Sequence, residues 1–229
     1  PTVVITAIWN AYDTQMEKFK NDKILYKIAT DFDFPLAPLL FKMEKRGVKI
    51  NTSYLADMSH ELGKKYEELQ QKIFDIAGYK FNIASPAQLS DMLFIELQLP
   101  TTGIKKGKTG YSTGQKELNK LRGLHPVIEL IEQTRELAKL KNTYVDALPK
   151  LVDKNYRLHT TFNQDVVSTG RLSSTHPNLQ NIPIRSTLGK KIRNAFIADE
   201  DNILVSADYS QFELRLAAIM AGDEDLIND

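Results

Sequence analysis

The sequence predicts an α+β fold, in which a mainly helical region is followed by a mixed α/β region with a short antiparallel sheet. Three observations predict it. Up to about residue 148, apolar residues recur at steps of three and four, the spacing of amphipathic helices. Residues 157–165 then alternate as strand residues do. Finally, the apolar run 203–207 is typical of a buried strand that stops at Asp208 and turns at once into a helix.

The first two expected helices cover the N-terminal fifth of the chain. Residues 3–28 carry Ile5, Ile8 and Trp9 at helical spacing. A short acidic link, 30–33, leads to a second apolar stripe that a basic last turn and Gly47 bring to an end.

The third helix is expected over residues 52–77, because Asn51 or Thr52 can cap its start and Gly78 stops it. A further helix starts at Ser85, which is followed by proline at the first helical position and by Gln88 three residues after the cap.

The segment 100–115 is rich in Gly, Thr and Lys, and nothing in it is expected to pack a core. We therefore expect a mobile, basic, exposed tip. A short helix to about residue 122 and a long helix over 126–148 follow. Two long, nearly antiparallel helices joined by this tip would form a protruding arm.

The mixed region begins at a boundary near residues 153–156. Residues 169–187 have the Thr, Ser, Asn and Pro content of a loop, and 192–196 is expected to be a short ordered piece. After the strand 203–207, the spacing predicts a helix over 210–221.

The net charge of +1 conceals a strong asymmetry. Residues 104–193 carry 17 basic and 7 acidic side chains, and residues 199–229 carry 1 and 9. A basic middle followed by an acidic end indicates a polyanion-binding surface leading to a cation site, although a basic solvated face would have the same composition.

Other compositional features bound the class of protein. The absence of cysteine excludes disulfides, thiolate metal sites and thiol nucleophiles, and fits a cytosolic setting. No apolar stretch approaches the roughly 18 residues of a membrane span, so a membrane partner is not expected. The chain starts at Pro1 and not at Met, so we expect the true N-terminus to lie upstream.

Three strings in the last third carry the most specific signal: TGRLSS at 169–174, PNLQNIP at 177–183 and DYSQFELR at 208–215. Residues 46–50, 81–85 and 137–144 add to it. In this order and spacing they resemble a family A DNA polymerase of the bacterial type, from about residue 30 to the end. The resemblance implies three parts, which are a remnant of an exonuclease-like domain over 1–29, a helical thumb over 30–153 and a partial palm over 154–229.

The resemblance implies catalytic roles for Asp208 and Glu213. Nucleotide addition uses two divalent ions, and Mg²⁺ prefers carboxylate oxygen. Asp208 would be one ligand, with the Tyr209 carbonyl as a second; by residue chemistry alone Asp208 could instead cap the following helix. Glu213 resembles the steric gate that selects deoxynucleotides, and its alternative is a solvated helix carboxylate.

The resemblance also implies contacts with duplex DNA. Arg171 would sense minor-groove acceptors that every base pair presents, and Gln180, Asn181 and Arg185 would contact the groove and backbone near the primer terminus. The amides of Gln180 and Asn181 could instead bond within their own loop. The arm offers side chains suited to phosphates or to plain solvated surface, namely Lys105, Lys106, Lys108, Ser112, Thr113, Lys139, Lys141, Asn142 and Thr143.

Several parts that the family needs are not seen in these residues, among them a second aspartate and a basic helix that binds the triphosphate. We therefore expect a piece of a DNA replication and repair enzyme that is inactive alone, holds Mg²⁺ weakly or not at all, and does not proofread. Its partners would be primer–template DNA and, in the complete enzyme, dNTP, and it would be a monomer in the bacterial cytosol. The alternative is a non-catalytic helical module that binds duplex DNA.

Overall fold

A computed structural model describes residues 2–108 and 110–228. The chain separates into two compact units, Pro1–Phe196 and Ile197–Asp229. The expected boundaries near residues 30 and 154 stay predictions. The first unit is mainly helical with small antiparallel sheets, which confirms the predicted α+β class.

The N-terminal helices differ from the expected single helix over 3–28. Helix α1 (Thr2–Asn21) ends at Asp22, whose carboxylate accepts from the amides of Ile24 and Leu25 and so starts α2 (Lys23–Ile28). A π-helical turn (Ala29–Asp33) then continues into α3 (Phe34–Arg46), so the acidic link is helical. The apolar stripe of α1 is exposed, with Trp9 64% accessible.

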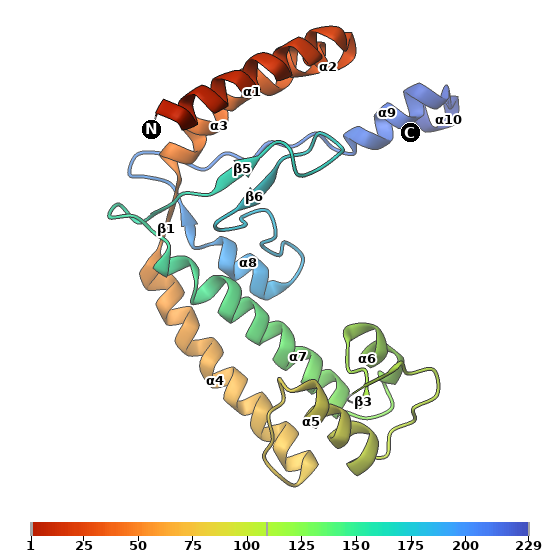
Figure 1. Ribbon diagram of the computed structural model, residues 1–229. Coiled ribbons are helices and arrows are strands. Elements are labelled where there is room, and N and C mark those ends of the chain that lie inside the picture. The colour runs from red at the N-terminus through yellow and green to blue at the C-terminus, as the bar shows by residue number, and fades with distance from the viewer. Residues whose placement is uncertain (1, 109, 229) are drawn as a thin grey trace. The chain divides into compact units, whose positions relative to one another are not determined.

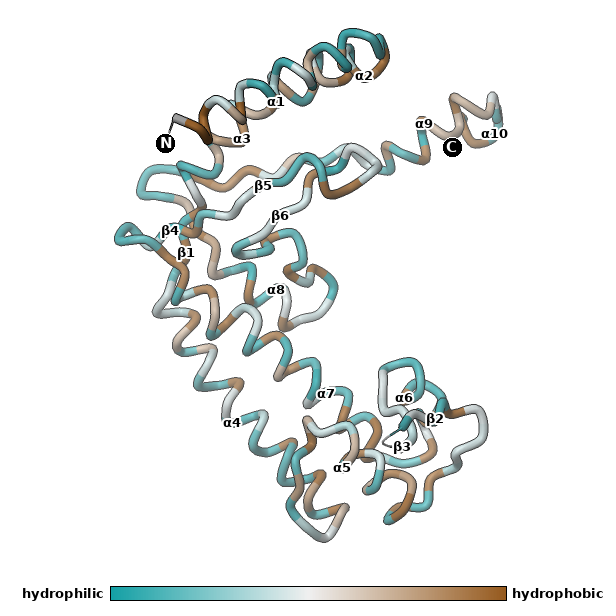
Figure 2. Tube along the Cα trace, viewed as in Figure 1, coloured by the Kyte–Doolittle hydropathy of each residue, from teal (hydrophilic) through white to brown (hydrophobic). Residues whose placement is uncertain are grey.

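The expected arm is formed by α4 (Thr52–Ala77) and α7 (Val127–Leu140), which lie side by side (Figure 1). Asn51 is the cap of α4, because its side chain accepts from the amide of Tyr54. Apolar and polar residues alternate along both helices (Figure 2), and the buried residues of the two helices form a shared core that includes Leu55, Leu62, Leu69, Leu137 and Leu140.

A second core lies at the far end of the arm. It is built from α5 (Pro86–Asp91), a π-helical turn (Met92–Glu96) and α6 (Gln115–Leu121), packed against the start of α7. The segment 100–115 is not the structureless tip expected from its composition. It contains a hairpin of β2 (Lys106–Gly107) and β3 (Gly110–Tyr111), and Ile104 is buried in the core because it is the one aliphatic residue among polar ones.

The long helix expected over 126–148 is shorter. After α7 come a π-helical turn (Lys141–Val145) and a 3₁₀ turn (Leu148–Lys150), since Pro149 cannot continue an α-helix. Strands β1 (Val48–Ile50), β4 (Arg157–Leu158) and β7 (Phe196–Ile197) are ordered β4-β1-β7.

A second small sheet pairs a strand from the expected strand region 157–165 with one from the region 169–187, which was expected to be loop. Strand β5 (Thr161–Asn163) pairs antiparallel with β6 (Ser173–Thr175), with Phe162 opposite Ser174. Helix α8 (Thr187–Arg193) follows, and it starts where the Ser186 hydroxyl accepts from the Gly189 amide.

The second unit contains α9 (Phe212–Ala221) and α10 (Glu224–Asn228). The predicted buried strand 203–207 is wrong for this structure: the segment is unpaired and exposed, with Ile203 83% and Val205 80% accessible. A strand needs a neighbour to supply ladder hydrogen bonds, and none of the described residues does so. No helix in the described part of the chain has the length and apolarity to cross a bilayer.

Candidate functional site

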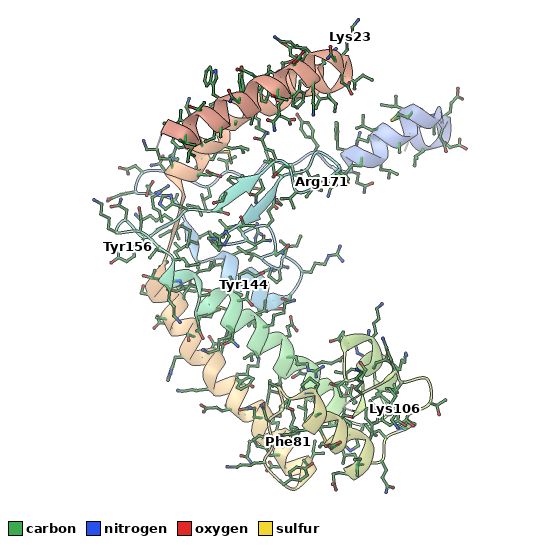
Figure 3. The ribbon with its side chains drawn as sticks, in the orientation of Figure 1. Lys23, Phe81, Lys106, Tyr144, Tyr156 and Arg171 are labelled. Atoms are coloured by element: carbon green, nitrogen blue, oxygen red, sulfur yellow. The ribbon has the colours of Figure 1, made fainter. Side chains whose placement is uncertain are left out.

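The first group of predicted DNA contacts lies on the β2–β3 hairpin. Lys106 pairs with Tyr111 across the hairpin, and its ammonium lies 5.3 Å from the centre of the Tyr111 ring (Figure 3 labels Lys106). This cation–π contact orients the amine without neutralising it. Lys105 and Lys108 flank the pair and are exposed. The Tyr111 amide donates to Ser90 Oγ at 3.0 Å, which ties the hairpin to α5.

Two further cations fasten the ends of this segment. The Lys120 ammonium donates to the Gly103 carbonyl at 2.7 Å, and Arg135 on α7 donates to the Thr113 carbonyl and to Thr113 Oγ1. Burial lowers the pKa of Arg135, but a guanidinium in a protein stays charged at neutral pH. Thr113 is itself buried and turned toward Arg135, whereas Ser112 is half-buried.

The second group lies where α7 ends. The Lys141 ammonium donates to Asp146 Oδ2 at 2.6 Å, and Ser59 Oγ on α4 donates to Asp146 Oδ1 at 2.7 Å. Burial alone would raise the pKa of the Asp146 carboxyl, but the bonds from Lys141 and Ser59 outweigh it and lower that pKa. Lys141 is therefore committed to an internal ion pair. The exposed members of the group are Lys139, Asn142 and Thr143.

The third group lies on the loops around β6. Arg171 is exposed in the connection from β5 to β6 (Figure 3). Gln180 is exposed, and its side-chain amide donates to the Leu172 carbonyl at 3.2 Å, so the strings TGRLSS and PNLQNIP touch. Gln180 thus makes a side-chain bond to the loop on the other side of β6. Asn181 and Arg185 are also exposed.

The predicted catalytic residues all lie in the second unit. Asp208 and Tyr209 are exposed at the end of the extended segment, and Glu213 is in the first turn of α9. Arg215, the last residue of the string DYSQFELR, donates to the Ser210 carbonyl at 3.1 Å and so satisfies an acceptor beside the helix start. Asp208 does not cap α9, because the position before Phe212 is Gln211.

The donors at Asp208 and Tyr209 are of the kind that Mg²⁺ accepts, namely carboxylate and carbonyl oxygen. They are too few for the octahedral shell of that ion. Over residues 2–108 and 110–228, no three His, Cys, Asp or Glu side chains gather as a metal cluster. The described residues therefore do not form a complete Mg²⁺ site by themselves.

Sequence reasoning missed three residues that hold these surfaces. Arg135 lies four residues after the buried Ile131 and therefore on the same face of the helix. A cation at helical spacing among apolar residues could have indicated its structural role. Tyr144 lies in the helix expected over 126–148, where its hydroxyl gives no signal of its own. Ser174 stood inside a recognised string, but its complete burial is visible only in the structure.

The chain matches the family model for DNA polymerase family A over residues 52–229. It is 47% identical over 218 residues to the thermostable DNA polymerase I of Thermus thermophilus, and the matched region covers 94% of this chain and 26% of that protein. It is 44% identical over 223 residues to DNA polymerase I of Bacillus subtilis, and that match covers 96% of this chain and 25% of that protein. The chain therefore spans about a quarter of the length of these curated relatives.

Its fold is also similar to a solved structure, the POL domain of Pol1 from M. smegmatis in complex with DNA primer-template and dNTP. The TM-score is 0.80 and the sequence identity 35%, over 96% of this chain and 38% of that chain.

Proposed function

The chain belongs to DNA polymerase family A, and from this premise we propose that it supplies the duplex-binding arm and part of the catalytic centre of a template-directed DNA polymerase. Such an enzyme adds a nucleotide from dNTP to a primer 3′-hydroxyl in DNA replication and repair. In this proposal residues 1–29 are an exonuclease-like remnant, 30–153 the thumb and 154–229 part of the palm. The protein would act as a monomer in the bacterial cytosol.

The observation that carries the proposal is the hairpin at the far end of the arm. It exposes Lys105, Lys106 and Lys108 on a segment that is fastened by Ser90 and Arg135. A flexible lysine tail would lose entropy on every phosphate contact, whereas a fixed hairpin offers its cations with less ordering cost. Phosphate contacts of this type grip a duplex without reading its sequence.

The loops around β6 complement this grip. Arg171, Asn181 and Gln180 carry amide and guanidinium donors, which match the acceptors that all base pairs present in the minor groove. We assign to them contacts near the primer terminus, and to Arg185 the nearby backbone. These assignments are supported by their exposure on two loops that touch through Gln180 and Leu172.

At the catalytic centre, Asp208 would hold Mg²⁺ together with the Tyr209 carbonyl and donors from other residues of the complete enzyme. When bound, two such ions stabilise the attacking and leaving oxygens of nucleotidyl transfer. Glu213, five residues further along the chain, would occupy the space of a ribose 2′-hydroxyl and so exclude ribonucleotides. Its place in the first turn of α9 and its nearness to Asp208 in the chain support this.

A chimera tests this proposal, in which the chain replaces the 223 matched residues of Bacillus subtilis DNA polymerase I. We expect the chimera to extend a primer, and Asp208→Asn to slow extension by on the order of 10²-fold or more, since a lost metal ligand removes several kcal/mol of transition-state stabilisation. Asp201→Asn is the matched control. It removes a carboxylate from the same unit at a positive φ that asparagine tolerates.

Two results would contradict the proposal. Equal rates for Asp208→Asn and the parent chimera would leave only the non-catalytic duplex-binding function. A chimera that extends no primer, although it is folded and carries Asp208, would contradict the polymerase assignment itself.

A further inference from the structure

The loop that carries Gln180 and Asn181, residues 177–183, is fixed at its far end by one phenol from the arm. Tyr144 Oη donates to the Asn181 carbonyl at 2.6 Å. Tyr144 is 5% exposed, and burial raises its pKa, so the hydroxyl keeps the proton that it donates. Beside it, Ile182 is buried in the core of the arm. The backbone at this end of the loop is therefore held by Tyr144 and by the core of the arm (Figure 3 labels Tyr144).

The near end of the loop is fixed by two buried hydroxyls. Ser174 is fully buried, and its Oγ accepts from the Leu179 amide at 2.9 Å. Thr160, 7% exposed, donates to the Pro177 carbonyl at 2.7 Å and lies 3.1 Å from Ser174 Oγ. A buried polar group without a partner is unfavourable, so such a network specifies one loop conformation strongly.

With both ends fixed through the backbone, the side chains of the loop are left on the surface. Asn178, Gln180 and Asn181 are all exposed. The Asn178 side chain accepts from the Gln180 amide at 3.0 Å, which shapes the turn between the two fastened ends. The buried hydroxyls thus hold the loop backbone, while the amide side chains lie at the surface, where that of Gln180 also donates to the Leu172 carbonyl.

We propose that Tyr144 and Ser174 are positioning residues, which hold loop 177–183 so that Gln180 and Asn181 meet the minor groove in a fixed geometry. This inference rests on the proposed function, because it takes the duplex as the ligand of those two amides. Recognition by short side chains requires placement to within about 0.5 Å, and a loose loop would not provide it.

Tyr144 also links two of the proposed contact groups. It belongs to the π-helical turn Lys141–Val145, next to Asn142 and Thr143, which are the exposed candidates for phosphate contacts. This hydrogen bond, together with the burial of Ile182 in the core of the arm, therefore helps to fix the distance between the phosphate-binding and groove-reading candidates. A shift of the arm would be transmitted directly to the loop.

The first test measures amide hydrogen exchange of the purified chain without DNA. Tyr144→Phe removes only the hydroxyl, and we expect amides in loop 177–183 to exchange about tenfold faster, as the loss of one buried hydrogen bond implies. Tyr54→Phe is the matched control, because Tyr54 Oη also donates to a backbone carbonyl, that of Lys191, at 3.1 Å. Unchanged exchange in the loop of Tyr144→Phe would overturn the inference.

The second test is a double-mutant cycle on the affinity for a primer–template duplex, at a temperature where every variant is folded by circular dichroism. Tyr144→Phe should weaken binding about fivefold in the parent chain. In a Gln180→Ala/Asn181→Ala background it should weaken binding less than about twofold, because the amides that it positions are gone. A merely structural role would give the same loss in both backgrounds.

Ser174→Ala provides an independent variant with the same expected pattern, and Ser85→Ala is its control, since Ser85 Oγ accepts from a backbone amide at the start of α5. The outcomes separate the two proposals. No duplex binding by the parent chain would overturn the proposed function and this inference with it. If the parent chain binds the duplex, but Tyr144→Phe and Ser174→Ala each weaken binding as much in the Gln180→Ala/Asn181→Ala background as in the parent chain, this inference is overturned and the proposed function stands.

Discussion

Replacing the three hairpin lysines by glutamine gives the most direct measure of the phosphate grip. Each phosphate that a lysine neutralises releases counterions, so log K falls with log[salt] by about 0.9 per contact on B-DNA. The structure shows which lysines are exposed and could contact phosphates. Lys105, Lys106 and Lys108 are exposed on the hairpin, with Lys105 also near Glu117, whereas Lys120 and Lys141 donate directly to Glu117 and Asp146.

Three contacts predict that the Lys105/Lys106/Lys108→Gln variant has a salt slope smaller by about 2.7. Between 50 and 200 mM salt, the parent chain should thus lose about 40-fold more affinity than the variant. Fluorescence anisotropy with a labelled duplex over a salt series measures both slopes. The loss should be the same for duplexes of unrelated sequence, because phosphates carry no sequence information.

The control for this experiment is Lys18/Lys20/Lys27→Gln, which removes the same charge from exposed positions on α1 and α2. Its slope should match that of the parent chain. The reasoning would be refuted if the hairpin variant changed the slope by less than about 1, or if the control changed it as much.

Three further outcomes are expected. In the chimera, Glu213→Ala should raise ribonucleotide incorporation relative to deoxynucleotide by at least about tenfold, measured by competitive primer extension, and an unchanged ratio would remove the steric role. Leu62→Ala should lower the free energy of unfolding by about 2–5 kcal/mol in urea titrations, against less than about 0.5 for the exposed Leu39→Ala. Because folding lowers the pKa of Asp146, the stabilisation by its carboxylate is complete above the ordinary pKa of 3.8 and is lost as the pH falls below that value. In unfolding titrations at different pH, Asp146→Asn should therefore lose less stability in acid than the parent chain. An equally steep loss in both would contradict the assignment.

Local signals predicted the helices well where one residue type decides the boundary. Asn51 and Ser85 are caps in the structure, as their side chains and the residues after them indicated. The break at Asp22 was missed because the apolar spacing continues across it, and only the bonds from its carboxylate reveal the interruption. Helical periodicity alone does not detect a cap inside a stripe.

Tertiary features were less accessible. The β2–β3 hairpin was concealed by a Gly- and Lys-rich composition, and its order depends on Ser90 and Arg135, which lie 21 and 22 residues from their partners. The types of the candidate site residues followed from the recognised strings, and their suggested roles stay predictions. Which of them are committed to internal bonds, as Lys141 is to Asp146, was not predictable, because Ser59 reaches the other oxygen of Asp146 only after α4 packs against the turn that follows α7.

The exposed segment 203–207 has a consequence for handling the protein. A β-branched stretch with open backbone groups is a template for strand addition, and a second copy is the nearest source of a matching strand. Asp201 and Asp208 border the stretch on its two sides. Parallel, in-register stacking would bring identical carboxylates face to face, so these acidic flanks act as gatekeepers against aggregation at neutral pH and lose that effect in acid.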